Sequence, residues 1–244
     1  MKIKHFLVSG LILLSLVFIG LQMIKFEVIA SFVRVILISL LTVLYYNQVS
    51  TKHTNFLKFL ITFLIADIIG LSYWFITLES ESSIDYTYFI CNGLYILSYV
   101  FLIIEVLKGM NIKDVITKLP APIVILVVLD IFCVTIVTDT AGEDLTNYQY
   151  SMEFLYNAVI MTLLTLAVIN YIYYVNKKAM NLLIGSIFIV FSEMIQLAYY
   201  YVLEINVLNV LCSLFLVFAF IFFYLQASLN YTENFSTYNE HLEA

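Results

Sequence analysis

Long apolar runs joined by short polar connections constrain this sequence more than any other feature. Of its 244 residues, 63% are hydrophobic and 11% are charged, whereas a soluble domain carries about 25% charged residues. A soluble fold of this length has too small an interior to bury so much apolar surface. Backbone polar groups must pair internally in lipid, and a helix needs about 20 apolar residues to cross the hydrocarbon core. The sequence therefore predicts an all-α integral membrane protein.

Eight apolar runs meet this requirement, and we expect a polytopic bundle of about eight transmembrane helices. The runs cover residues 6–24, 28–46, 56–78, 86–107, 122–138, 152–175, 180–203 and 207–229. Residues 1–229 are predicted to form a single transmembrane helical domain. Residues 230–244 are polar and acidic, and we predict that they form a cytoplasmic tail.

The distribution of lysines predicts the orientation of the bundle. With eight spans, most lysines fall on one side of the membrane, namely Lys2, Lys4, Lys52, Lys58, Lys108, Lys113, Lys118, Lys177 and Lys178. The connections on the opposite side contain Lys25 and are otherwise acidic. Because cytoplasmic loops are enriched in Lys and Arg, both ends of the chain are predicted to be cytoplasmic. In a bacterial cell this predicts a multi-pass protein of the inner membrane.

Several kinds of site have no candidate residues in the spans. Cys91, Cys133 and Cys212 lie inside apolar runs without CxxC spacing, which indicates packing rather than a metal site or a disulfide. No predicted span contains histidine, so a histidine-ligated zinc site or a Ser-His nucleophile pair has no candidate residues. The net charge of -6 gives no indication of nucleic-acid binding. We therefore expect no metal and no cofactor.

Four ionisable residues lie well inside predicted spans, where charged groups are costly and usually functional. Arg34 lies in the second span, and Asp67, Asp130 and Glu193 lie near the middle of the third, fifth and seventh. One interpretation is a buried ion pair plus neutral acids that fix helix packing. The other is a polar cavity on which the four groups converge. We favour the cavity, because a pairing alone would need only two of the four groups.

The seventh span contains a motif that resembles one in a known family. Gly185 is followed, eight residues later, by the acid of the pair Ser192 and Glu193. This spacing resembles the seventh-helix motif of the YhhN-type lysoplasmalogenase family, in which the acid is usually Asp. The resemblance covers most of the chain in the number and order of spans.

Two further positions are similar to motifs of the same family. Asp67 resembles the aspartate of its helix-three Gly-Asp motif, with Ala66 in place of the glycine. Arg34 resembles its basic residue in helix two, although Val35 follows where the family often has proline. The fourth span lacks the family's histidine and has several hydroxyl groups instead, among them Tyr99.

The resemblance implies hydrolysis of the vinyl ether bond of a lysoplasmalogen, a membrane lipid, to a fatty aldehyde and a glycerophospho-base. A vinyl ether hydrolyses through protonation at carbon, and a carboxylic acid in an apolar site keeps a proton available near neutral pH. Asp67 and Glu193 are expected to be the catalytic acids, in roles that the sequence does not divide between them. The expected substrate-binding residues are Arg34, Ser192, Asp130 and Tyr99.

Two alternatives come from other functional classes. A proton-coupled transporter would use Asp67, Asp130 and Glu193 as a relay, although such carriers often have internal repeats and broken helices, and we find no clear repeat here. A structural or sensory membrane protein would use the same acids only to fix helix packing. The near-isosteric change Asp67→Asn separates these classes, because a packing role should tolerate it and a proton-transfer role should not.

Overall fold

The computed structural model describes residues 2–49, 52–75, 85–142 and 145–229. Within these ranges the chain forms nine α-helices and one short 3-10 helix, without any strand. They are α1 (Lys2–Met23), α2 (Glu27–Gln48), α3 (Thr54–Ser72), η1 (Tyr73–Phe75), α4 (Tyr86–Lys108), α5 (Ile112–Lys118), α6 (Pro120–Ala141), α7 (Asn147–Tyr174), α8 (Lys177–Tyr201) and α9 (Asn206–Ser228). The predicted tail, 230–244, lies outside the described residues.

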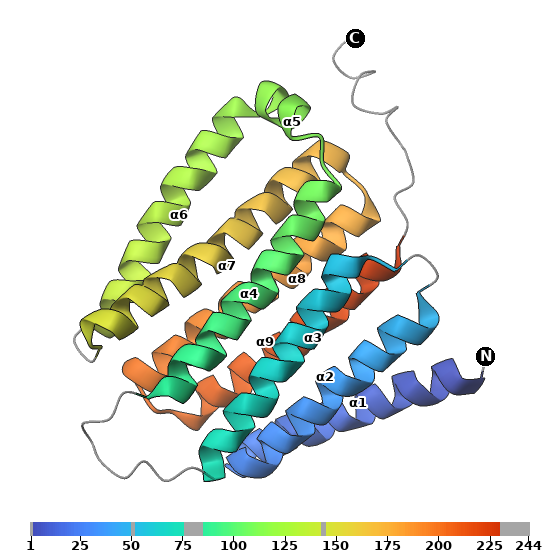
Figure 1. Cartoon of the computed structure of the whole chain (residues 1–244), viewed down its shortest axis with the longest axis vertical. Coiled ribbons are helices and arrows are strands. Elements are labelled where there is room, and N and C mark those ends of the chain that lie inside the picture. Colours follow the sequence, from blue (N-terminus) through green and yellow to red (C-terminus); the bar gives the residue numbers. More distant parts are fainter. Residues whose placement is uncertain (1, 50–51, 76–84, 143–144, 230–244) are drawn as a thin grey trace.

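Seven helices, α2, α3, α4, α6, α7, α8 and α9, are long and apolar enough to cross a membrane. The first predicted span falls on α1, whose described apolar part, Leu7–Met23, is somewhat shorter. The structure therefore confirms the polytopic helical bundle, and each predicted span falls on a helix of its own. α1 begins and α9 ends at the same end of the bundle (Figure 1), while the cytoplasmic position of that end stays a prediction.

Two helix boundaries differ from the predicted spans by five residues or more. The third predicted span runs to residue 78, whereas the α-helix ends at Ser72 and η1 continues the chain to Phe75. α7 begins at Asn147 rather than residue 152, because Thr146 and Gln149 form a capping box that satisfies backbone groups of its first turn. Hydropathy predicts the part of a helix that contacts lipid. In α7 a polar cap extends the helix beyond this apolar part.

The short helix α5 lies in the connection between α4 and α6 and is held against the end of α7. Its first turn is capped by the side chain of Asn111. The Tyr173 hydroxyl donates a hydrogen bond to Asp114, and the Lys118 ammonium lies 3.0 Å from the same carboxyl group. These two contacts, led by that of Tyr173, hold the pKa of the Asp114 carboxyl group below its ordinary value.

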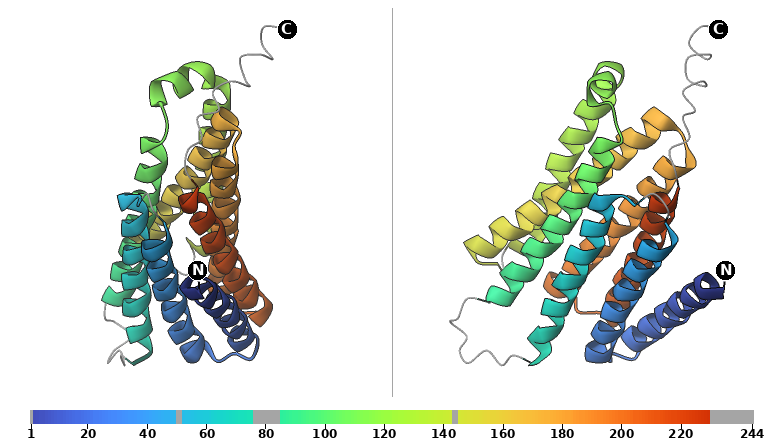
Figure 2. Two further views of the ribbon diagram at one scale, coloured as in Figure 1. Left: turned by 90° about the vertical axis from the view of Figure 1, so that its right-hand side faces the viewer. Right: turned by 45° about the vertical axis from the view of Figure 1, so that its right-hand side comes forward.

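Helices that follow one another in the chain pack side by side (Figures 1 and 2). α8 packs along α9, α3 along α4, α6 along α7 and α1 along α2, while α7 also contacts α4 and α8. Aromatic rings lie at the centre of the largest apolar cluster, with neighbouring centroids 4.8 to 6.3 Å apart. These rings are Phe59, Phe63, Tyr99, Phe220 and Phe223.

Gly185 allows α8 and α9 to approach each other closely. A Cβ atom at this position would lie 2.7 Å from the ring of Phe223 and 3.3 Å from the carbonyl oxygen of Ala219. Both distances are shorter than ordinary van der Waals contact, and Phe223 is fully buried. The glycine of the seventh-span motif therefore has a packing role that is independent of any chemistry.

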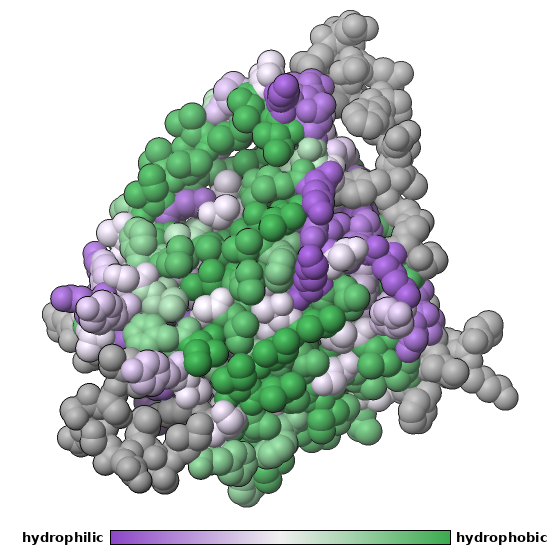
Figure 3. Space-filling model, in the orientation of Figure 1, coloured by the Kyte–Doolittle hydropathy of each residue, from purple (hydrophilic) through white to green (hydrophobic). Residues whose placement is uncertain are grey.

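The face of the bundle seen in Figure 3 is largely apolar. α6 is the most exposed of the long helices, because it packs mainly against α7 and turns the rest of its surface outward. Its large exposed side chains include Val124, Ile125, Val128, Ile131 and Phe132. A surface of this kind is stable in contact with lipid and would aggregate in water.

Candidate functional site in a half-membrane cavity

A cavity of about 620 Å³ lies inside one half of the bundle. Its wall comes from the first parts of α2, α4, α7 and α9, the later parts of α3 and α8, and the ends of α1 and η1. All of these segments adjoin the connections that follow α1, α3, α6 and α8. α6 itself contributes no lining residue. On the predicted orientation, the cavity lies in the half of the membrane that faces away from the cytoplasm.

The cavity wall is rich in carboxyl groups and tyrosines. Among the described lining residues the carboxyl groups belong to Glu27, Asp67, Asp85, Glu153 and Glu193. Arg34 is the single Lys or Arg of this lining. Such a concentration of ionisable groups in a membrane domain is the usual mark of a functional site.

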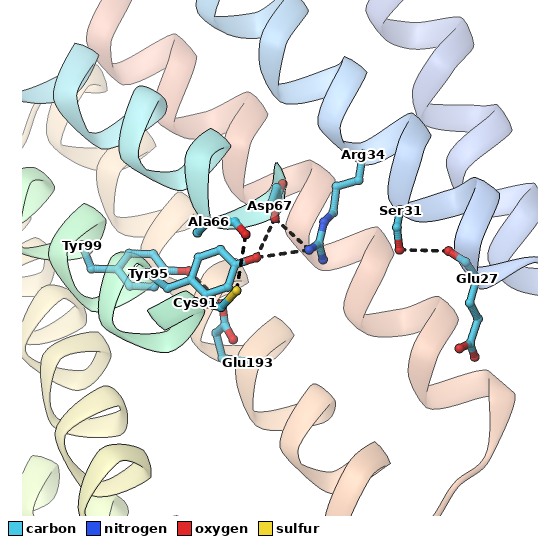
Figure 4. A network of polar contacts seen from close by, with 9 residues as sticks. All are labelled: Glu27, Ser31, Arg34, Ala66, Asp67, Cys91, Tyr95, Tyr99 and Glu193. Carbon is cyan, nitrogen blue, oxygen red and sulfur yellow. Dashed lines mark hydrogen bonds and ion pairs between the residues drawn. The ribbon is translucent and has the colours of Figure 1, made fainter. Parts of the chain in front are cut away.

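Arg34, Asp67 and Tyr95 form a hydrogen-bonded network that joins α2, α3 and α4 (Figure 4). Nη2 of Arg34 lies 2.7 Å from Oδ1 of Asp67 and donates to the Tyr95 hydroxyl at 3.2 Å. The Tyr95 hydroxyl in turn donates to Oδ1 of Asp67 at 2.6 Å. Charge-assisted bonds of this kind are among the stronger side-chain contacts.

The two members of this ion pair differ in their access to the cavity. The side chain of Arg34 is 28% exposed, whereas that of Asp67 is 0% exposed. Nε of Arg34 and Oδ2 of Asp67 are both buried, and neither has a hydrogen-bond partner among the described residues. A bound molecule would therefore touch Arg34 first, while Asp67 holds the guanidinium group in place from behind.

Glu193 of α8 lies close to this network and has a phenol as its hydrogen-bond partner (Figure 4). The Tyr99 hydroxyl donates to Oε1 of Glu193 at 2.8 Å, and Tyr156 lines the same cavity. Within the described residues no ion pair involves Glu193. Its side chain lines the cavity and is partly exposed. Of the predicted acids, Glu193 alone combines access to the cavity with freedom from an ion pair.

The remaining predicted site residues are placed differently. Ser192 is buried at the cavity wall, and its hydroxyl donates to a backbone carbonyl of α9 at 2.8 Å, so it joins two helices. Tyr99 is fully buried behind the wall. Asp130 lies on α6 beside Thr165 of α7 and outside the cavity. The expectation that all four groups converge is therefore wrong for Asp130, because α6 packs on the outer side of α7.

Several residues of the cavity were not predicted from the sequence. Glu153 lies near a span end, where the sequence favours snorkelling to the interface, yet it lines the cavity and accepts a hydrogen bond from Tyr88 at 2.6 Å. Tyr88, Asn92 and Tyr95 all line the cavity from α4. Their spacing of four and three residues places them on one helix face, and this periodicity was the available signal.

A histidine–carboxyl contact lies at the opposite end of the bundle and does not belong to the cavity. Nδ1 of His53 lies 2.7 Å from Oε1 of Glu105, and the backbone N–H of His53 donates to the Tyr45 hydroxyl at 2.8 Å. These contacts link the α2–α3 connection to α4. Among the described residues, no group of three or more His, Cys, Asp and Glu side chains is arranged to hold a metal ion.

Neither a family model, nor a curated protein, nor a solved structure matches this chain. The proposal that follows is therefore supported by the residues of the cavity and by their chemistry.

Proposed function

We propose that this protein is a membrane hydrolase that cleaves the vinyl ether bond of a lysoplasmalogen-type lipid. The observation that carries the proposal is the position of Glu193, a partly exposed acid that accepts a hydrogen bond from Tyr99, beside the Arg34–Asp67 ion pair in one cavity. The lipid substrate reaches the protein within the membrane, and in a bacterial cell this is the inner membrane.

Glu193 is the proton donor in this proposal. Tyr99 donates to Oε1, which leaves Oε2 of the neutral acid to carry the transferable proton. The proton goes to the vinyl carbon remote from the ether oxygen, and an oxocarbenium ion forms. The carboxylate left on Glu193 then lies beside the positive charge and stabilises it.

Water completes the reaction. It adds to the oxocarbenium carbon and loses a proton to the Glu193 carboxylate, which restores the acid. The hemiacetal hydroxyl then loses its proton as the carbon–oxygen bond to the glycerol breaks, which releases a fatty aldehyde, and the glycerol oxygen takes up a proton and leaves as the alcohol. One water molecule is consumed, and no oxidant, reductant or metal is required.

Arg34 is the proposed phosphate-binding group. Arg34 lines the cavity and is the partly exposed member of the ion pair, and guanidinium groups bind phosphate oxygens through paired N–H donors. Asp67 and Tyr95 hold this guanidinium in one orientation, so we assign Asp67 a positioning role. Glu193 and Asp67 thus have different proposed roles, which the sequence alone did not assign.

A proton-coupled transporter is the competing function. A relay would require exchangeable groups that lead from one membrane face to the other. Between the cavity and the predicted cytoplasmic side, the bundle is instead packed with the rings of Phe59, Phe63 and Phe220. Asp130 does not line the cavity and so does not extend such a relay. A cavity with one closed end suits an enzyme better than a relay.

The test is aldehyde release from a lysoplasmalogen by protein in bilayer nanodiscs, without any ion gradient. Wild-type protein should release aldehyde, and Glu193→Gln should lose about 100-fold or more of the rate, as removal of a general acid typically does. Asp67→Asn should chiefly raise KM, because the Arg34 guanidinium loses the carboxylate that holds it in position to bind phosphate.

Asp130→Asn is the matched control, since it removes a membrane-embedded carboxyl group that lies outside the cavity. It should keep the wild-type rate. Absence of aldehyde release from folded wild-type protein across several head groups and chain lengths would overturn the proposed activity.

A further inference from the structure

A small apolar pocket lies between α6, α7 and α8, and we call it the side pocket. Its volume is about 10 Å³. The apolar part of its wall includes Val134, Val137, Ile160, Met161, Val190 and Met194. Unlike the large cavity, it receives side chains from α6.

The side pocket and the polar cavity meet at two residues. Asn157 of α7 and Glu193 of α8 line both of them. Asn157 is held in place because its amide group donates to the Thr138 hydroxyl of α6 at 3.1 Å, and both residues are buried. Glu193 therefore lies at a border between a polar compartment and an apolar one.

This border matches the chemistry of a single-chain lipid. In a vinyl ether lysophospholipid the reacting double bond is formed by the first two carbons of the hydrocarbon chain, immediately next to the polar glycerol. A head group in the polar cavity and a chain in the side pocket would bring this bond to Glu193. The geometry then explains why the acid is placed at the junction rather than deep in either compartment.

The side pocket must widen to admit a chain, since its volume is close to that of one water probe. Two features of its wall allow this. Met161 and Met194 have unbranched thioether side chains, which repack more readily than branched ones. α6 also packs mainly against α7, and its buried described residues are Val134, Thr138 and Ala141, so an outward shift disturbs few buried contacts.

We propose that the side pocket is a hydrocarbon-chain subsite, entered from the bilayer beside α6, which holds the single chain of a lysophospholipid-type ligand with its first carbons at Glu193. The identity of this ligand rests on the proposed function. The position of its chain rests on the shared lining of the two pockets.

The test uses a saturated alkyl-ether lysophospholipid that carries a photoreactive diazirine in its chain, which vinyl ether chemistry cannot cleave. It is added to the full chain in nanodiscs of diacyl lipid and irradiated, with and without excess unlabelled lysophospholipid. Crosslinks that the competitor removes should map to the side-pocket residues of α6, α7 and α8.

Two variants at one helix provide the comparison. Val137→Phe fills the side pocket and should lower the competed crosslinking about tenfold, whereas Val128→Phe makes the same change on the lipid-facing side of α6 and should have no effect. Val190→Phe repeats the test from α8 in case Val137→Phe fails to fold. Turnover of a long-chain vinyl ether should fall with Val137→Phe, while turnover of a short-chain analogue should persist.

The outcomes separate this inference from the proposed function. Vinyl ether hydrolysis with competed crosslinks elsewhere in the protein, or with a Val137→Phe variant equal to Val128→Phe, overturns the chain subsite and leaves the activity intact. Competed crosslinks in the side pocket without hydrolysis support the subsite and overturn the activity.

Discussion

At the scale of single residues, the Arg34–Asp67 pair shows how the membrane domain tolerates charge. Each charge lowers the free-energy cost of burying the other. Tyr95 donates a hydrogen bond to the same Asp67 oxygen that contacts Arg34. The pair is still incompletely satisfied, because one buried atom on each side lacks a hydrogen-bond partner within the described chain. Such unmet capacity is uncommon in a group that serves packing alone.

Removing one partner should therefore cost more than removing both. Arg34→Met leaves the Asp67 carboxyl group buried without its cation, and it should lower the free energy of unfolding by roughly 3 kcal/mol, at the lower end of the range for buried pairs because Arg34 is partly exposed. The double variant Arg34→Met/Asp67→Asn should recover most of this loss. SDS titration in mixed micelles measures the wild type, both single variants and the double variant, and additive losses would contradict the ion-pair account.

At the scale of helices, Gly185 sets the distance between α8 and α9. Gly185→Ala places a methyl group against the buried ring of Phe223, which has no free space to enter. We expect a loss of about 1–3 kcal/mol in the free energy of unfolding, the usual cost of overpacking. Thermal unfolding in detergent measures the effect.

Gly93→Ala is the matched control for this prediction. Gly93 also lies inside a long helix, α4, but a Cβ atom there would meet nothing within 4 Å. Alanine has the higher helix propensity, so this variant should be neutral or slightly more stable. Equal losses at the two positions would show that the Phe223 contact is not the cause.

The attachment of α5 to α7 should depend on pH through Asp114. Tyr173 and Lys118 lower the pKa of this carboxyl group in the folded protein, so the contact contributes stability above the ordinary Asp value, about 3.9. That contribution is lost as the pH falls through the lowered folded value. Hydrogen exchange of the α5 amides should accelerate in Asp114→Asn at pH 7, and the difference from wild type should shrink below about pH 4.

Lys113→Gln serves as the control for α5, since Lys113 is exposed on the same helix and is not among the Asp114 partners. It should leave amide exchange unchanged at both pH values. A difference between Asp114→Asn and wild type that persists unchanged at low pH would argue against the carboxylate contact.

The helices could be predicted from the sequence more completely than the site. Apolar runs report lipid contact directly, which is why each of the predicted spans falls on a helix. The site depends instead on how each helix is rotated about its own axis. That rotation is set by contacts such as Gly185 with Phe223, and it carries Asp67 and Glu193 into one cavity while it leaves Asp130 on an outer helix. Depth along a span could be read from the sequence, whereas the helix face that meets the cavity was indicated only on α4, by the spacing of its polar residues.

At the scale of the whole molecule, the cavity occupies one half of the bundle, and the lysine pattern predicts which half this is. A cysteine at the cavity rim should therefore react from outside the cell. In a chain whose native cysteines are replaced by serine, Asn209→Cys should be modified by a membrane-impermeant maleimide added to intact cells. Lys113→Cys, in α5 at the other end, should react only after permeabilisation.

The reverse labelling pattern would invert the predicted orientation without changing the site. Labelling of both positions in intact cells would instead point to leakage of the reagent, and a control on a known cytoplasmic thiol detects that case. The two positions are suited to the comparison because Asn209 lines the cavity and Lys113 is exposed.

The closed end of the cavity also bears on the membrane voltage. Water that fills an open cavity stays close to the electrical potential of the solution with which it is continuous, so the voltage falls mainly across the aromatic layer of Phe59, Phe63 and Phe220 beneath it. Moving one charge across the full membrane is worth about 2.3 kcal/mol per 100 mV. A proton that reaches Glu193 through the cavity crosses almost none of that field. If Glu193 is the proton donor that we propose, its chemistry is insulated from the membrane voltage.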